Sequence, residues 1–136
     1  MCIRDRPYIE AVAKKFNSQI TLLVKENSKV DQLIKNNEFI KEIEQDLSEG
    51  ADAIIIKPAL SYLDIISRAK NKFNVPIIAY NVSGEYSIVK AGNEKKYIEE
   101  EHVMMEIMYS IKRAGADAII TYHALEIANA LKKDHV

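Results

Sequence analysis

Hydrophobic residues in this chain alternate between short continuous runs and stretches with helical spacing. Continuous apolar runs bounded by turn-forming residues are typical of buried strands, and they occur at residues 53–56, 75–82 and 118–122. A fourth run, at residues 19–24, is rich in leucine and β-branched residues and predicts another short strand. Helical spacing predicts helices over residues 37–47, 61–73, 100–114 and 124–133, with a further helical stretch from about Tyr86. Strands that alternate with helices predict parallel strands joined by right-handed crossovers.

Each predicted helix carries one apolar face, which is expected to pack on the sheet. In the helix over residues 37–47, Phe39 and Ile43 lie on this face. In the last helix, the spacing predicts that Ala124, Ala128 and Leu131 are buried.

The strand at residues 53–56 belongs to a repeated segment. The sequence GADAIIIKPAL, which begins at Gly50, returns as GADAIITYHAL from Gly115, and eight of the eleven positions are identical. Each glycine follows a predicted helix, where a left-handed backbone is expected to end it. Lys57 and Tyr122 hold equivalent positions, at the points where the two repeated strands leave the core.

Polar side chains follow all three clear strands, namely Lys57, Ser83 with Glu85, and Tyr122. Since ligand sites in parallel α/β folds lie at the carboxyl ends of the strands, we expect these side chains on one rim. A lysine amine must be neutral to attack a carbonyl, and burial favours that form, so Lys57 suits Schiff-base catalysis. Ser83 and Tyr122 offer neutral hydroxyl donors for a substrate carboxylate. An ion pair for Lys57 and a half-buried core position for Tyr122 are the alternatives that spacing leaves open.

Composition narrows the class of protein. The chain has 136 residues, of which 48% are hydrophobic and 29% charged, which is enough for one domain with a real core. A net charge of −1 gives no sign of nucleic acid or of an anionic membrane as a partner. The single cysteine, Cys2, excludes an internal disulfide framework and a site of several thiolates. No apolar run approaches the roughly 20 residues that span a bilayer, and nothing resembles a secretory signal, so we expect a cytoplasmic protein.

Three motifs closely resemble the porphobilinogen synthase (δ-aminolevulinic acid dehydratase) family. They are KPALSYLD at residues 57–64, AYNVSGEY at residues 79–86, and IKRAGAD at residues 111–117 followed by Thr121 and Tyr122. The resemblance implies the TIM (β/α)8 barrel, an α/β fold, of which this chain holds only the C-terminal part, with three to four parallel strands and flanking helices. Residues 7–136 would then be part of a single barrel domain. Residues 1–6 fit no periodic pattern, and we expect them to be a non-native leader.

The same resemblance implies an activity and roles for four residues. Members of the family are lyases (hydro-lyases) that condense two 5-aminolevulinate molecules to porphobilinogen in tetrapyrrole and heme biosynthesis. Lys57 falls on the Schiff-base lysine, and Ser83 and Tyr122 fall on residues that bind the carboxylate of the same substrate molecule. Glu42 falls on a position that binds an allosteric magnesium in some bacterial members, although a solvated glutamate on a helix face is an equal alternative. The resemblance implies a divalent metal, magnesium or zinc, no organic cofactor, and a homo-oligomer, with an octamer expected.

The chain also departs from the family pattern. Asn81 stands where the family has glutamine, and His123 stands where the family usually has an aromatic residue. The second active-site lysine, the ligands of the catalytic metal and the arginine-bearing lid are not recognisable. Since three or four strands cannot close an eight-stranded barrel, we expect this chain alone to be poorly soluble and inactive. Another Schiff-base α/β-barrel lyase, such as an aldolase, and a non-catalytic truncated product are the alternative interpretations.

Overall fold

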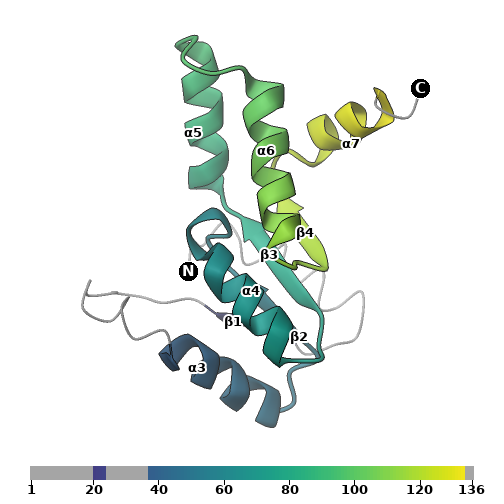
Figure 1. Cartoon of the computed structure of the whole chain (residues 1–136). Helices are drawn as coiled ribbons and strands as arrows, with labels where there is room; N and C mark the ends of the chain where they lie inside the picture. The colour runs from purple at the N-terminus through teal and green to yellow at the C-terminus, as the bar shows by residue number, and fades with distance from the viewer. Residues whose placement is uncertain (1–19, 24–36, 134–136) are drawn as a thin grey trace.

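The structure is a computed structural model that describes residues 20–23 and 37–133, and it contains one parallel sheet (Figure 1). The strands are β1 (Ile20–Leu23), β2 (Ala53–Ile56), β3 (Ile77–Asn81) and β4 (Ala118–Thr121). The helices are α3 (Asn37–Ser48), α4 (Leu63–Lys72), α5 (Ser83–Glu94), α6 (Glu100–Arg113) and α7 (Ala124–Lys133), and a 3₁₀ turn, η1 (Leu60–Tyr62), precedes α4. Every strand pairs with its neighbours in the chain, in the order β1-β2-β3-β4. The predicted parallel α/β arrangement is therefore confirmed.

The predicted elements agree with the observed ones except at two helix starts. The chain after β3 enters α5 at Ser83, so the helix begins three residues before the predicted position near Tyr86. The helix expected from Ser61 begins instead at Leu63, after η1. Gly50 and Gly115 have φ values of 100° and 109°, which confirms the left-handed backbone predicted for both.

One face of the sheet packs against helices to form the main core. The strand residues on this face follow the period of two, with Ile54 and Ile56 on β2 and Ile77 on β3, and all three are at most 2% exposed. Residues of α3, α4 and α6 cover them, including the predicted Phe39 and Ile43. Full burial of one such side chain stabilises the fold by about 1.5–3 kcal/mol. Apolar side chains at every second position of the strands therefore anchor the sheet to the helices.

The opposite face of the sheet carries the next residues along each strand. Ile55 pairs with Ile78 and Tyr80 pairs with Ile120, so these residues share the face that the helices do not cover. By the same alternation, Lys57 at the end of β2 lies on this face. In a barrel this would be the interior, and the rows at the carboxyl ends of the strands would line its mouth.

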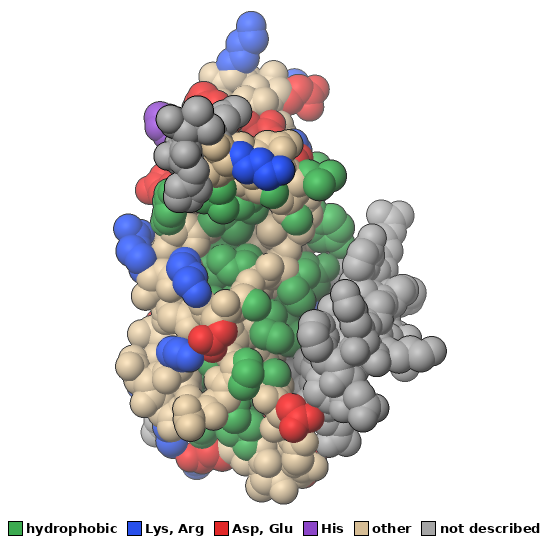
Figure 2. Space-filling view, turned by 90° about the vertical axis from the view of Figure 1, so that its right-hand side faces the viewer, with side chains coloured by type: hydrophobic (Ala, Val, Ile, Leu, Met, Phe, Trp, Pro, Cys, Tyr) green, Lys and Arg blue, Asp and Glu red, His purple; other side chains and the backbone are tan. Residues whose placement is uncertain are grey.

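The prediction for the buried face of α7 is wrong. Ala124 and Ala128 are exposed and Leu131 is 40% exposed, whereas Ala130 is 5% exposed and Ile127 packs against the core. Both sets of residues have helical spacing, and the contacts with α6 and β4 select the second one. Ala124, Ile127 and Leu131 border an open apolar groove between α6, β4 and α7. Figure 2 shows the band of hydrophobic side chains on this side of the molecule.

The edge of the sheet at β4 is anchored by a carboxylate of the repeated segment. Asp117 accepts a hydrogen bond from the backbone N–H of Ile77 at 2.8 Å and forms an ion pair with Lys70 at 2.7 Å. The backbone hydrogen bond and the ammonium group together hold the pKa of Asp117 below its ordinary value. Within the described ranges, β4 pairs only with β3, and no helix is long and apolar enough to cross a membrane.

Candidate functional site

Lys57 lies where β2 leaves the core, as the sequence predicts. Its side chain is buried, with only 9% of the residue exposed, and its Nζ lies 5.8 Å from the centre of the Tyr80 ring. Tyr80 is itself 3% exposed on the neighbouring strand. The lysine therefore lies beside an aromatic ring on the face of the sheet opposite the main core.

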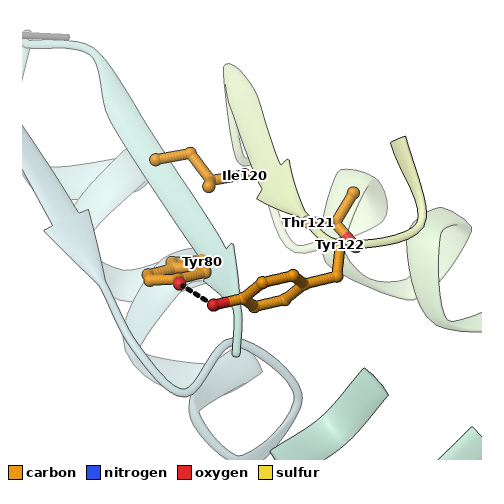
Figure 3. Close-up of a pocket in the computed structure, with 4 residues that line it drawn as sticks. All are labelled: Tyr80, Ile120, Thr121 and Tyr122. Atoms are coloured by element: carbon orange, nitrogen blue, oxygen red, sulfur yellow. Dashed lines mark hydrogen bonds between the residues drawn. The ribbon is translucent and has the colours of Figure 1, made fainter. Parts of the chain in front are cut away.

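Tyr122 reaches the same aromatic residue from the other side. The Tyr80 hydroxyl donates a hydrogen bond to the Tyr122 hydroxyl at 3.3 Å, and the two ring centres are 6.4 Å apart. The two tyrosines, Ile120 and Thr121 line a cavity of about 230 Å³ (Figure 3). Tyr122 is 38% exposed, so its ring remains accessible at the cavity wall. Tyr80 thus connects Lys57 and Tyr122 on one rim, as the repeat predicts.

Ser83 occupies the first position of α5 rather than a loop. It is exposed and follows Val82, the residue that caps the helix with an extended backbone. The first turn of a helix presents backbone N–H groups that lack helical partners, and the helix dipole favours an anion there. Ser83 therefore lies at the same end of the sheet as Lys57, beside a helix terminus that suits a carboxylate.

A single carboxylate links the strand ends that carry these residues. Glu85 accepts hydrogen bonds from the backbone N–H of Leu60 at 2.7 Å, from the backbone N–H of Val82 at 2.8 Å, and from the Asn81 side chain at 3.0 Å. Glu85 is the third residue of α5, where a glutamate commonly reaches back to the residue that caps the helix. The bond to Leu60 extends this local motif to the loop that follows Lys57.

Asn81 passes the connection on to β4. It is 1% exposed, and its Oδ1 accepts a hydrogen bond from the Thr121 hydroxyl at 2.9 Å. The Thr121 oxygen in turn accepts the backbone N–H of His123 at 3.1 Å. The shorter amide that replaces the glutamine of the family pattern therefore bonds at both ends, because its NH₂ group donates to Glu85 and its oxygen accepts from Thr121.

Glu42 lies apart from these strand ends. It is an exposed residue in the middle of α3. Among the described residues, Glu42 belongs to no group of three histidine, cysteine or carboxylate side chains close enough to share an ion. One exposed carboxylate is an incomplete ligand set for a cation held by the protein, so the structure does not bring Glu42 into a metal site.

Sequence reasoning named Asn81 and Glu85 but missed Tyr80 and the contacts by which Asn81 and Glu85 support the site. The alternation along β3 carried a signal for Tyr80, because a residue on the same face as Lys57 belongs to the same rim. The position of Glu85 three residues after Val82 carried a signal for a helix-capping role. Nothing local indicated the bond to Leu60, which joins residues 25 positions apart.

A parallel sheet of consecutive strands, covered by helices on one face and ending in polar side chains, defines the chain as a segment of a (β/α) barrel. A sequence profile of the family described as "Delta-aminolevulinic acid dehydratase" matches residues 7–130. The chain therefore belongs to the delta-aminolevulinic acid dehydratase family.

Individual relatives agree with this assignment. Delta-aminolevulinic acid dehydratase of Staphylococcus aureus is 58% identical over 96 residues, which cover 71% of this chain and 30% of that protein. The Staphylococcus epidermidis enzyme is 57% identical over the same length. The crystal structure of the Toxoplasma gondii porphobilinogen synthase, in complex with the reaction product porphobilinogen, matches 79% of this chain and 31% of its own with a TM-score of 0.69 and 42% identity.

These comparisons confirm the predicted family and fold. The chain is part of a TIM barrel, and the four described strands are consistent with an incomplete barrel. The chain spans about 30% of the length of the curated relatives it matches.

Proposed function

We propose that the protein to which this chain belongs is a porphobilinogen synthase, which condenses two 5-aminolevulinate molecules to porphobilinogen with loss of two waters. Family membership supports this, as does the 42% identical Toxoplasma gondii structure that holds porphobilinogen. The single observation in this chain that carries the proposal is the placement of Lys57 and Tyr122 on either side of Tyr80, at the carboxyl ends of β2 and β4, the two strands that flank β3.

In this proposal Lys57 is the nucleophile. Its nitrogen bonds to the ketone carbon of 5-aminolevulinate, the ketone oxygen leaves as water, and the lysine becomes a protonated imine. The buried setting of Lys57 supports this role because it shields the imine from bulk water, and the cavity beside Tyr80 and Tyr122 offers space for substrate.

Ser83 and Tyr122 would hold the carboxylate of the same substrate molecule. Both provide neutral hydroxyl donors, and the start of α5 adds backbone N–H groups with a favourable dipole. The 3.3 Å bond between the Tyr80 and Tyr122 hydroxyls supports the role of Tyr122, since it fixes the phenol that would donate to the carboxylate.

This chain supplies only the proposed Schiff-base part of the active site. The role of Glu42 in allosteric magnesium binding, the requirement for magnesium or zinc, the octameric assembly and the cytoplasmic location stay predictions drawn from the sequence. With about 30% of a relative's length, the chain alone is expected to give no turnover of 5-aminolevulinate.

Reductive trapping tests the proposal without requiring turnover. The 136-residue chain is incubated with 5-aminolevulinate and borohydride, and peptide mass spectrometry locates the adduct. We expect modification of Lys57 that is lost in Lys57→Arg and kept in Lys70→Arg, which alters an exposed lysine of the same chain. Equal trapping of unrelated aldehydes and ketones would favour an aldolase-like barrel enzyme. No adduct with any carbonyl compound would favour a non-catalytic chain.

A further inference from the structure

A second group of polar side chains lies on the outer side of the barrel segment, between α5, α6 and α7. Glu100 is the first residue of α6, His123 lies between β4 and α7, and Glu126 lies in the first turn of α7. One ligand atom from each of the three lies within 4.8 Å of the others. We call these three residues the helix-junction cluster. Among the described residues, these three side chains are close enough to share one metal ion.

His123 is the unusual member of the helix-junction cluster. It is 1% exposed, and neither ring nitrogen has a hydrogen-bond partner among the described residues. The ring of Tyr86 packs against it with 4.5 Å between ring centres, so water has little access from that side. A buried polar group without a partner destabilises the folded state. A ligand bound by the imidazole nitrogen that faces the two carboxylates would give one of the two nitrogens a partner.

The chemical state of these side chains suits a cation. Burial lowers the pKa of His123, which keeps the imidazole neutral and able to bind a metal ion. The pKa of Glu126 is lowered by a hydrogen bond from its own backbone N–H and by Lys90, so this carboxylate is ionised. A cavity of about 380 Å³ opens onto Glu100 and Glu126 and provides an entry path.

Lys90 of α5 already neutralises part of this charge. Its ammonium group forms ion pairs with Glu100 and, at 3.2 Å, with Glu126, and its side chain is 35% exposed. These contacts hold the pKa of Lys90 well above its ordinary value, with the bond to Glu100 as the largest cause. A divalent ion would interact with the same two carboxylates and carry twice the charge of the ammonium group. It would also coordinate the imidazole nitrogen of His123. The partly exposed Lys90 side chain would then turn toward solvent.

We propose that Glu100, His123 and Glu126 bind a divalent first-row transition metal ion, of the class of Zn²⁺ or Co²⁺, in competition with Lys90. One imidazole and two carboxylates form a mixed nitrogen and oxygen set, which such ions accept and which Mg²⁺ disfavours. The ion would join α6, α7 and the end of β4, directly behind Tyr122. This site is separate from Glu42, which lies on α3.

Cobalt absorption spectroscopy tests the proposal on the whole chain. The chain carries no affinity tag and contains Cys2→Ser and His135→Phe, which remove two further donors outside the described residues. We expect one Co²⁺ per chain with visible d–d bands, displacement by Zn²⁺, no displacement by Mg²⁺ at the same concentration, and a rise in Tm on binding. Absence of any saturable Co²⁺ spectrum in the folded chain, checked by circular dichroism, would overturn the proposal.

Three variants assign the binding to the helix-junction cluster. His123→Phe, which keeps an aromatic ring in the buried position, is expected to abolish the bands. Lys90→Gln removes the competing charge and is expected to tighten binding at least about 10-fold. His102→Phe is the matched control, because His102 is 94% exposed beside Glu99 and should bind metal only weakly. Unchanged binding in His123→Phe, or weaker binding in folded Lys90→Gln, would show that the ion lies elsewhere.

Discussion

The carboxylate of Glu85 accepts the backbone N–H of Leu60 at 2.7 Å, across 25 positions of sequence. Leu60 lies three residues after Lys57, and Glu85 lies two residues after Ser83. The same carboxylate also binds Asn81, which continues the connection to β4. The three strand ends of the proposed site are therefore connected by side-chain hydrogen bonds as well as by packing.

The first prediction concerns Glu85. Glu85→Gln replaces one carboxylate oxygen by an NH₂ group that cannot accept a hydrogen bond, so one of the two backbone N–H groups loses its partner and we expect a loss of about 1–3 kcal/mol in the free energy of unfolding. We also expect slower trapping of 5-aminolevulinate on Lys57, because the loop after Lys57 loses its anchor. Urea denaturation and the trapping assay measure the two effects.

The control for this variant is Glu94→Gln, which alters the last residue of the same helix. It should change neither the unfolding midpoint nor the trapping rate. Glu85→Gln with full stability and unaltered trapping would show that the carboxylate has no positioning role.

A second prediction separates the hydroxyl of Tyr122 from its ring. Tyr122→Phe keeps the aromatic wall of the cavity and removes the proposed donor to the substrate carboxylate. Since a hydrogen bond to a charged group contributes about 1.5–3 kcal/mol, the 5-aminolevulinate concentration for half-maximal trapping should rise at least about 10-fold. Tyr97→Phe, at a site 83% exposed, is the matched control. Equal concentration dependence in both variants would remove Tyr122 from the site.

A third prediction compares two glycines. Gly115 has a φ of 109°, and an added Cβ would lie 2.9 Å from Cγ of Lys70, so Gly115→Ala should destabilise the chain by about 1–3 kcal/mol. Gly84 lies in the first turn of α5, and an added Cβ would meet nothing within 4 Å. Gly84→Ala should therefore leave stability unchanged or raise it by up to about 1 kcal/mol. Thermal unfolding of the pair measures both, and a milder effect at Gly115 than at Gly84 would contradict the assigned backbone.

A fourth prediction concerns pH. The pKa of Asp117 is lower in the folded chain than its ordinary value of 3.8, first because of the backbone N–H of Ile77 and then because of Lys70. The stability that this carboxylate contributes is therefore present above pH 3.8 and is lost as the pH falls toward the folded pKa.

The variant Asp117→Asn isolates this contribution. Its urea midpoint should lie below that of the unaltered chain at pH 7, and the difference should shrink as the pH falls below 3.8. Glu106→Gln, at an exposed position on α6, provides the comparison. A difference that grows on acidification would mean that the sign of the shift is wrong.

Much of the fold was predictable because the strands are continuous apolar runs. Continuous apolar runs then mark them without help from tertiary contacts, and Gly50 and Gly115 mark the helix ends that precede two of them. The start of α5 was missed because serine and glycine are also common in loops, although both are tolerated in a first helical turn. The buried face of α7 was missed because two apolar stripes share the helix, and only the neighbouring elements decide between them.

The proposed site was predictable only in part, and for a different reason. The repeat places Lys57 and Tyr122 at equivalent strand ends, so their common rim follows from the sequence. The contacts of Glu85 with Leu60 and of Asn81 with Thr121 join residues 25 and 40 positions apart, and no local pattern encodes such distances.

The repeated segment also has a consequence for the height of the site within a barrel. The register of the sheet, continued one residue past β2, places Lys57 opposite Tyr80 on β3, and Tyr80 pairs with Ile120 on β4. Tyr122 lies two residues after Ile120. A barrel of eight strands with a shear of 8 staggers each strand by about one residue, so two strands give an offset of about two residues. Strands two apart contribute to the same layer of such a barrel. Lys57 and Tyr122, which hold equivalent positions of the repeat, would therefore lie at the same height along the barrel axis, in one layer of interior side chains.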